Sequence, residues 1–284
     1  MEDLKKIREK ITEIDNQMAQ LFEARMRQVA KVAEYKRQKG LPIYDPKREN
    51  EVHAKGGARV VGMARRGARL EELAGQIESD GLPGKVLPYV GDVCSREVNE
   101  GMIDFAVEKC GKLDVLVNNA GIMDGFEAIG DISDERWDQV FAVNVKGPMF
   151  AMRKAVQVML GQKTRGNIVN VASIGGTNGA RAGAAYTASK HALVGMTENT
   201  GYMYAHEGIR CNAICPSTVV TPMTTGSSVQ DIDPDMIGAM GRHMDLKIHP
   251  CMPDDVAKIM IFPISDDSRA LTGQALVADF GATL

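Results

Sequence analysis

The sequence lacks both the cysteine pattern of a disulfide-stapled protein and the long apolar run of a membrane span. Its five cysteines are odd in number and show no CxxC or zinc-ligand spacing, which fits free thiols in a reducing compartment. No apolar stretch approaches the roughly 20 residues that a membrane-spanning helix needs. We therefore expect a cytoplasmic protein with no disulfide framework, no metal site and no membrane partner.

A surplus of positive charge is also missing. The chain has 34 Lys and Arg against 37 Asp and Glu, a formal net charge of −3. Nucleic-acid-binding domains usually carry the opposite balance, so no nucleic-acid partner is expected. With 44% hydrophobic and 25% charged residues over 284 positions, the composition is that of a folded protein and excludes disordered and collagen-like chains.

Glycine and proline are absent from the first 39 residues. Apolar residues recur there at three- and four-residue spacing, which predicts one long amphipathic helix of about 35 residues that ends near Gly40 and Pro42. After residue 54 glycine becomes frequent, and short β-branched runs alternate with helical stretches. The expected strands are 59–62, 86–90, 113–117, 167–171, 209–214 and 275–277. This alternation predicts an α/β fold, a Rossmann-like doubly wound parallel sheet over residues 53–284, with residues 1–52 as an N-terminal long-helix appendage.

Tyr186 and Lys190 stand one turn apart at the start of an expected helix. A nearby ammonium stabilises a phenolate, so we expect Lys190 to lower the pKa of Tyr186 and make it a usable acid or base. Ser173 follows an expected strand, at the edge where open α/β sheets place their sites. A Tyr and a Lys at this spacing are common on exposed helices, so the pair alone is a weak signal and its context decides.

The context resembles the short-chain dehydrogenase/reductase family over about residues 54–284. The resemblance rests on the Asn118-Asn119-Ala120-Gly121 motif, on Ser173 thirteen positions before Tyr186, on Asn144 in the sequence NVKG, and on Pro216 with Thr221. It implies an oxidoreductase that uses NADP or NAD to interconvert a secondary alcohol and a carbonyl. Tyr186 would be the general acid/base, Lys190 would lower its pKa and hold the nicotinamide ribose, Ser173 would orient the substrate oxygen, and Asn144 would support a proton-relay water. The implied cofactor-binding residues are Asp92, Asn119, Gly121, Lys190, Val219 and Thr221.

Arg65 and Arg66 follow the expected strand 59–62, where a dinucleotide-binding fold reads the adenosine ribose. Arginine suits a 2′-phosphate through bidentate contacts, so NADP is favoured over NAD. The alternative is that both are solvated arginines in a charged turn.

One expected feature of that family is absent. No strand and Gly-rich TGxxxGxG turn, which would bind the cofactor pyrophosphate, precedes Arg59. The turn would fall at 39–46, where one glycine is accompanied by Asp45 and two prolines. The missing strand would be central, between strands 59–62 and 113–117, so its loss leaves two inner edges unpaired. We predict that part of residues 28–46, with 31–33 the most strand-compatible piece, fills this gap or that the region packs badly.

Residues 1–52 instead resemble the N-terminal part of the all-helical chorismate mutase family, through the segment 7–11, Glu23-Ala24-Arg25 and the sequence LPIYDPKRENEV at 41–52. By that resemblance Arg8 and Arg25 would bind the carboxylates of chorismate, Lys36 its ether oxygen, and Asp45, Arg48 and Glu49 its hydroxyl end. The family's last two helices should follow Val52, but the reductase-like pattern begins there, so only half a site is expected. Cations at the edge of a coiled coil are the simpler interpretation of Arg8, Arg25 and Lys36.

The sequence therefore favours an NAD(P)(H)-dependent oxidoreductase acting on a small molecule. The alternatives are a chorismate mutase and a catalytically impaired chimera. Met223, Met236, Met240 and Met244 fall in a stretch that resembles the family's substrate lid, which is compatible with an apolar or steroid-sized substrate, although methionines at this spacing more often pack helices. Self-association into a dimer or tetramer through helices around 133–162 and 184–206 is expected from the resemblance.

Overall fold

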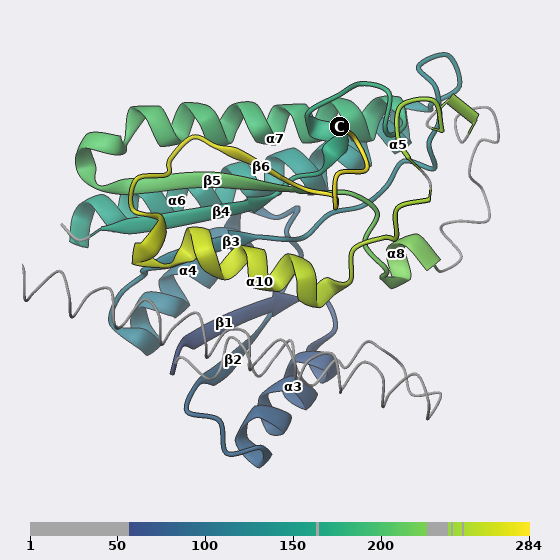
Figure 1. Ribbon diagram of the computed structural model, residues 1–284. Helices are drawn as coiled ribbons and strands as arrows, with labels where there is room; N and C mark the ends of the chain where they lie inside the picture. The colour runs from purple at the N-terminus through teal and green to yellow at the C-terminus, as the bar shows by residue number, and fades with distance from the viewer. Residues whose placement is uncertain (1–56, 163–164, 226–237, 240, 246) are drawn as a thin grey trace, which may run out of the picture. The chain divides into compact units, whose positions relative to one another are not determined.

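The computed structural model describes residues 57–162, 165–225, 238–239, 241–245 and 247–284. In these residues parallel strands alternate with helices, and Figure 1 shows α6 and α7 on one face of the larger sheet and α10 on the other. The strands are β1 (Arg59–Ala64), β2 (Lys85–Val90), β3 (Val115–Asn118), β4 (Gly166–Val171), β5 (Ile209–Pro216) and β6 (Ala275–Ala278). The α-helices are α3 (Gly67–Ser79), α4 (Arg96–Cys110), α5 (Asp134–Phe141), α6 (Gly147–Gln162), α7 (Ala184–Met203), α8 (Pro222–Thr225) and α10 (Pro253–Ile264).

Shorter turns complete the described elements. The 3-10 turns are η2 (Ile174–Gly176), η3 (Ala205–Glu207) and η5 (Asp266–Ser268), and a π-helical turn, η1 (Ala142–Lys146), joins α5 to α6. Each of the six expected strands overlaps an observed one, and the predicted α/β class is confirmed. The long helix expected over 1–39 lies outside the described residues.

The strands form two separate sheets. β1 pairs with β2 alone, and β3, β4, β5 and β6 form the second sheet in that order. Within the described residues, one edge of β1 and one edge of β3 therefore have no strand partner, and Val60 and Val117 on these strands are 40% and 37% exposed. This is the break that a missing central strand predicts. The segment 28–46 proposed to fill it lies outside the described residues.

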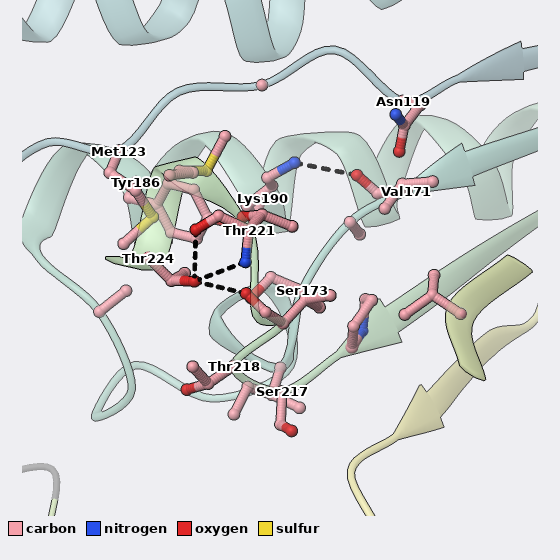
Figure 2. A pocket seen from close by; sticks show the side chains of 18 of the residues that line it. Asn119, Met123, Val171, Ser173, Tyr186, Lys190, Ser217, Thr218, Thr221 and Thr224 are labelled. Carbon is pink, nitrogen blue, oxygen red and sulfur yellow. Dashed lines mark hydrogen bonds between the residues drawn. The ribbon is translucent and has the colours of Figure 1, made fainter. Parts of the chain in front are cut away.

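The ends of three strands position the candidate site. Asn118, Val171 and Pro216 are the last residues of β3, β4 and β5, and the loops that follow them open onto one cavity (Figure 2). Parallel strands bring their carboxyl ends to one edge of the sheet, so residues far apart in sequence meet there.

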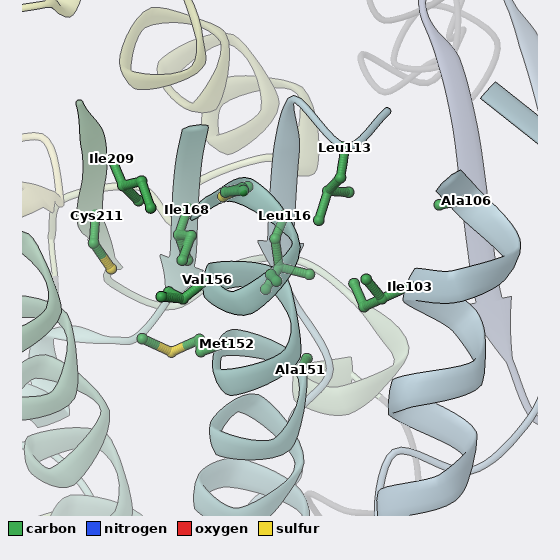
Figure 3. Close-up of a cluster of buried hydrophobic side chains, with 12 residues drawn as sticks. Ile103, Ala106, Leu113, Leu116, Ala151, Met152, Val156, Ile168, Ile209 and Cys211 are labelled. Carbon is green, nitrogen blue, oxygen red and sulfur yellow. The ribbon is translucent and has the colours of Figure 1, made fainter. Parts of the chain in front are cut away.

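The core beneath this cavity packs α4 and α6 against β3, β4 and β5 (Figure 3). Ile103, Leu116, Ala151 and Ile168 are at most 4% exposed. Burying an aliphatic side chain of this size contributes about 1.5–3 kcal/mol. Burial on both faces explains why apolar residues occupy adjacent positions in these strands, Ile168-Val169 in β4 and Ala213-Ile214-Cys215 in β5.

Candidate active site

A cavity of about 800 Å³ lies at the carboxyl ends of β3, β4 and β5. It brings together most of the residues selected from the sequence for the reductase site: Asn119, Gly121, Ser173, Tyr186, Lys190, Val219 and Thr221. Figure 2 shows Ser173, Tyr186 and Lys190 gathered on one side of this space. The expected catalytic residues Ser173, Tyr186 and Lys190 and the expected nicotinamide-side residues therefore share one site.

The first turn of α7 is held by a buried carboxylate from another loop. Asp124 is fully buried, and its Oδ2 accepts the backbone N–H of Tyr186 at 2.8 Å while Oδ1 accepts that of Phe126 at 3.0 Å. A carboxylate at a helix N-terminus is stabilised by the free N–H groups there. The approach also requires glycine at position 183, since a Cβ there would lie 2.5–2.7 Å from the Asp124 carboxylate. Asp124 thus fixes the backbone of Tyr186.

Ser173 joins β4 to the site. Its backbone is extended, and its Oγ accepts the N–H of Gly175 at 3.0 Å. The Ser173 side chain is close enough to that of Tyr186 to lower the pKa of the phenol. The serine hydroxyl therefore lies beside the phenol, where it can orient an oxygen that binds to both.

Lys190 anchors α7 to the end of β4. It is 3% exposed, and its Nζ donates to the carbonyl oxygen of Val171 at 2.9 Å, as Figure 2 shows. The same Nζ lies 5.5 Å from the centre of the Tyr186 ring. The lysine is therefore adjacent to the tyrosine, as the spacing predicts. Its hydrogen bond, however, goes to the backbone oxygen of Val171 rather than to the phenol.

The pKa of Tyr186 moves in the opposite direction from the sequence prediction. Burial raises the pKa of Tyr186 to about 12, because it disfavours the phenolate more than the Ser173 side chain favours it. Burial also lowers the pKa of Lys190 to about 8. The expected lowering of the tyrosine pKa by the lysine is wrong for this state, since burial dominates both groups. At neutral pH the phenol keeps its proton, which suits it to donate.

The buried lysine should make stability depend on pH. Its pKa is about 8 in the folded protein and ordinarily 10.5, so the unfolded chain binds more protons between these values and the free energy of unfolding rises with pH there. A shift of this size corresponds to about 3 kcal/mol. We expect wild type to gain this amount relative to Lys190→Met between pH 8 and 10.5, measured by urea unfolding.

Wild type and Lys190→Met share all their other titrating groups. The difference between their unfolding free energies therefore cancels the contributions that those groups make equally to both proteins. Lys112→Met, at an exposed lysine that pairs with Asp114, is the matched control and should run parallel to wild type. Equal pH slopes for wild type and Lys190→Met would show that Lys190 is not titrating in this way.

Asn144 is fully buried in the π-helical turn and is not part of the cavity lining. Its Nδ2 donates to the carbonyl oxygen of Ile122 and to Ser189 Oγ, both at 3.0 Å, and its Oδ1 accepts the N–H of Ile122 at 2.9 Å. The side chain thus ties the loop after β3 to α7. π-Helical turns are frequent at functional sites, and a water-holding role for Asn144 remains a prediction.

Three residues predicted to bind the adenosine end lie outside this cavity. Arg65, Arg66 and Asp92 follow β1 and β2, and all are exposed. The backbone N–H of Cys94 lowers the pKa of Asp92, and the charge of Arg65 adds to this effect. Arg65 and Asp92 are therefore neighbours at the carboxyl ends of β1 and β2, and neither belongs to the lining of the cavity.

Sequence reasoning missed two residues of the site, Asp124 and Arg181. Asp124 caps a helix that begins sixty positions later, and Arg181 lines the cavity from the loop before α7. Neither has a local pattern that points to these contacts. Of the four methionines in the expected lid, Met223 and Met244 line the cavity, whereas Met236 and Met240 lie outside the described residues.

Other kinds of site are not found in the described part of the chain. It contains no group of three potential metal ligands, and none of its helices is long and apolar enough to cross a bilayer. All five cysteines are free, and Cys211 and Cys215 are buried in β5.

Comparison with known proteins gives two family matches. The family model described as enoyl-(acyl carrier protein) reductase matches residues 51–283, and that of type II chorismate mutase matches residues 7–78. The second match extends beyond the segment predicted from sequence. Its described part, residues 57–78, folds as β1 and most of α3, so an all-helical continuation is not present there. The six candidate chorismate-binding residues, Arg8, Arg25, Lys36, Asp45, Arg48 and Glu49, lie outside the described residues.

Individual relatives agree with the first match. A 3β-hydroxysteroid dehydrogenase from Mediterraneibacter gnavus is 35% identical over 246 residues, 81% of this chain and 87% of that protein. A 3β-hydroxysteroid dehydrogenase 2 from Eggerthella lenta is 38% identical over 190 residues, 67% of this chain and 72% of that protein.

Solved structures share the fold. Levodione reductase aligns with a TM-score of 0.74 at 27% identity, covering 84% of this chain and 92% of that one. Carveol dehydrogenase from Mycobacterium avium, solved in complex with NAD, aligns with a TM-score of 0.73 at 24% identity, covering 83% and 92%. With a matching family model over 51–283 and these relatives, the chain belongs to the short-chain dehydrogenase/reductase family of oxidoreductases.

Proposed function

We propose that this protein interconverts a secondary alcohol and a ketone with a nicotinamide coenzyme, with Tyr186 as the proton donor and acceptor. The observation that carries the proposal is the meeting of Ser173, Tyr186 and Lys190 at one cavity, with the serine close enough to lower the pKa of the tyrosine. In reduction, Tyr186 gives its proton to the carbonyl oxygen while Ser173 orients that oxygen. In oxidation the same groups act in reverse.

The residues present fit one half of the coenzyme. Asn119, Gly121, Lys190, Val219 and Thr221 line the catalytic cavity and would hold the nicotinamide and its ribose. When bound, the coenzyme supplies or accepts the hydride at the carbon that bears the oxygen. A Gly-rich turn for the pyrophosphate is absent from the described residues. Arg65 and Arg66, beside Asp92, would meet a 2′-phosphate, so NADP is the coenzyme we favour.

An apolar substrate suits this cavity. Met123, Phe126, Met223, Met244 and Met260 are part of its wall, and methionine adapts to irregular apolar shapes. Two relatives are named for 3β-hydroxysteroids. We propose a ketone or alcohol of steroid size, handled by a cytoplasmic homo-oligomer, a dimer or tetramer.

The test is coenzyme oxidation followed at 340 nm with a 3-oxosteroid, together with calorimetric titration of NADPH and NADH. Trp137 stacks on Phe141 and does not line the cavity, so calorimetry reports binding more directly than tryptophan fluorescence. Binding of neither coenzyme at millimolar concentration would refute the proposal.

A second candidate is chorismate mutase, favoured by the family match over residues 7–78. Such an enzyme holds a dianion in a reactive geometry and stabilises the charge separated at the ether bond. It needs no coenzyme, so loss of chorismate absorbance in the absence of NADPH distinguishes it from the proposed reductase.

A further inference from the structure

An arginine without an ion-pair partner lies in the wall of the catalytic cavity. Arg181, on the loop between η2 and α7, lines the same cavity as Tyr186. Its Nη2 donates to the carbonyl oxygen of Thr283 at 3.3 Å, while its Nε is buried without a hydrogen-bond partner. Among the ion pairs of the described residues none includes Arg181. The guanidinium therefore keeps donors free for a ligand.

Asp279, the acid whose pKa the charge of Arg181 helps to lower, does not use those donors. Although burial opposes it, hydrogen bonds from Thr283 and Gly281 lower the pKa of Asp279, and the charge of Arg181 adds to this. Asp279 is already bonded, because its oxygens accept the N–H groups of Gly281 and Thr283 and the Thr283 hydroxyl. Asp279 and Thr283 thus stabilise the turn that contacts Arg181. They leave the other N–H donors of the guanidinium available to a ligand.

In the described part of the lining, no carboxylate side chain would compete with a bound anion for Arg181. Among the described residues, this lining includes the two cations Arg181 and Lys190 and no aspartate or glutamate. Lys190 donates to the carbonyl oxygen of Val171 and, in the proposed function, to the nicotinamide ribose, whereas Met123, Phe126 and Met260 supply apolar wall. A buried guanidinium donor in apolar surroundings is costly unless it is bonded, and a carboxylate matches its geometry with two parallel hydrogen bonds.

We propose that Arg181 forms a carboxylate-binding subsite, which makes the enzyme selective for an apolar ketone or alcohol that also carries a carboxylate group. This inference rests on the proposed function for the identity of the bound molecule as a substrate. The other possible anion is a coenzyme phosphate. The arginines that follow β1, Arg65 and Arg66, lie outside this cavity, and Arg181 shares its wall with the apolar residues, so the substrate is the favoured source.

The test uses a matched pair of substrates, a 3-oxosteroid whose side chain ends in a carboxylate and the methyl ester of the same molecule. In wild type we expect kcat/KM for the acid to exceed that for the ester by at least about tenfold. Arg181→Met should lose about 30-fold on the acid and less than about threefold on the ester. Arg181→Lys, which retains the charge, should keep part of the preference. Equal losses on acid and ester in Arg181→Met would overturn the inference.

Calorimetric binding of the acid and the ester to the free enzyme separates this inference from the proposed function. Suppose that wild type binds the acid more tightly than the ester, that Arg181→Met loses this preference, and that no substrate is turned over. The carboxylate-binding subsite is then supported and the proposed function is refuted. Binding of acid and ester with equal affinity, or of neither at millimolar concentration, overturns the subsite. If Arg181→Met weakens NADPH binding and leaves binding of the acid unchanged, Arg181 contacts the coenzyme phosphate instead and the inference is wrong.

Discussion

Replacing Tyr186 with phenylalanine is expected to lower kcat for ketone reduction by about a thousandfold or more. The change removes only the hydroxyl, which lies close enough to Ser173 for the serine to lower its pKa, and keeps the ring. Proton transfer by a positioned side chain typically accelerates a reaction by about 10²–10⁴-fold, and at neutral pH this phenol, whose pKa burial raises to about 12, holds the proton to be donated. Steady-state NADPH oxidation at saturating ketone measures the loss.

Binding measurements distinguish a chemical effect from a folding defect. Tyr186→Phe should retain coenzyme affinity within about threefold, because the ring and Lys190 both remain. Tyr202→Phe, at a tyrosine that is 81% exposed, is the matched control and should keep full activity. Activity within tenfold of wild type in Tyr186→Phe would mean that another group delivers the proton.

The strands were predictable because their physical causes are local. β4 and β5 are buried on both faces, so each appears in the sequence as a short β-branched run bounded by helical stretches. The assembly of Ser173, Tyr186 and Lys190 followed from a different argument, since the motif spacing identified the family and all three residues follow β4, Ser173 soon after the strand and the other two on α7. In both cases the sequence carries the relevant pattern.

Other features depend on burial, which a single sequence does not show. The sequence places a lysine one turn from Tyr186 and so predicts a lowered pKa, but the fold removes both groups from water and the pKa of Tyr186 rises. Asn144 was chosen as a water ligand, yet the fold satisfies its amide with Ile122 and Ser189. No local sequence pattern marks Asp124, because Tyr186, whose backbone N–H it accepts, is distant in sequence. These contacts are tertiary, and they require coordinates.

The absence of a Gly-rich turn, in contrast, was read from the sequence and has a large expected effect. Replacing residues 1–52 with a β-strand followed by a TGxxxGxG turn and a helix should lower the dissociation constant for NADPH by about 100-fold or more. Backbone N–H groups at a helix N-terminus bind phosphate directly, and no such turn is found in the described residues before β2. Calorimetric titration of NADPH into both proteins measures the change.

The same graft should also stabilise the fold, and one control separates the two effects. A new central strand would pair with the edges of β1 and β3 that have no strand partner among the described residues, and each net hydrogen bond contributes about 0.5–1.5 kcal/mol. A graft whose turn glycines are replaced by valine retains the strand and obstructs close approach of the phosphates. We expect this control to gain stability in urea and little NADPH affinity. If the full graft and the control bind NADPH equally, the phosphate turn is not what limits coenzyme binding. Any gain in affinity over the original protein would then come from the new strand that pairs with β1 and β3.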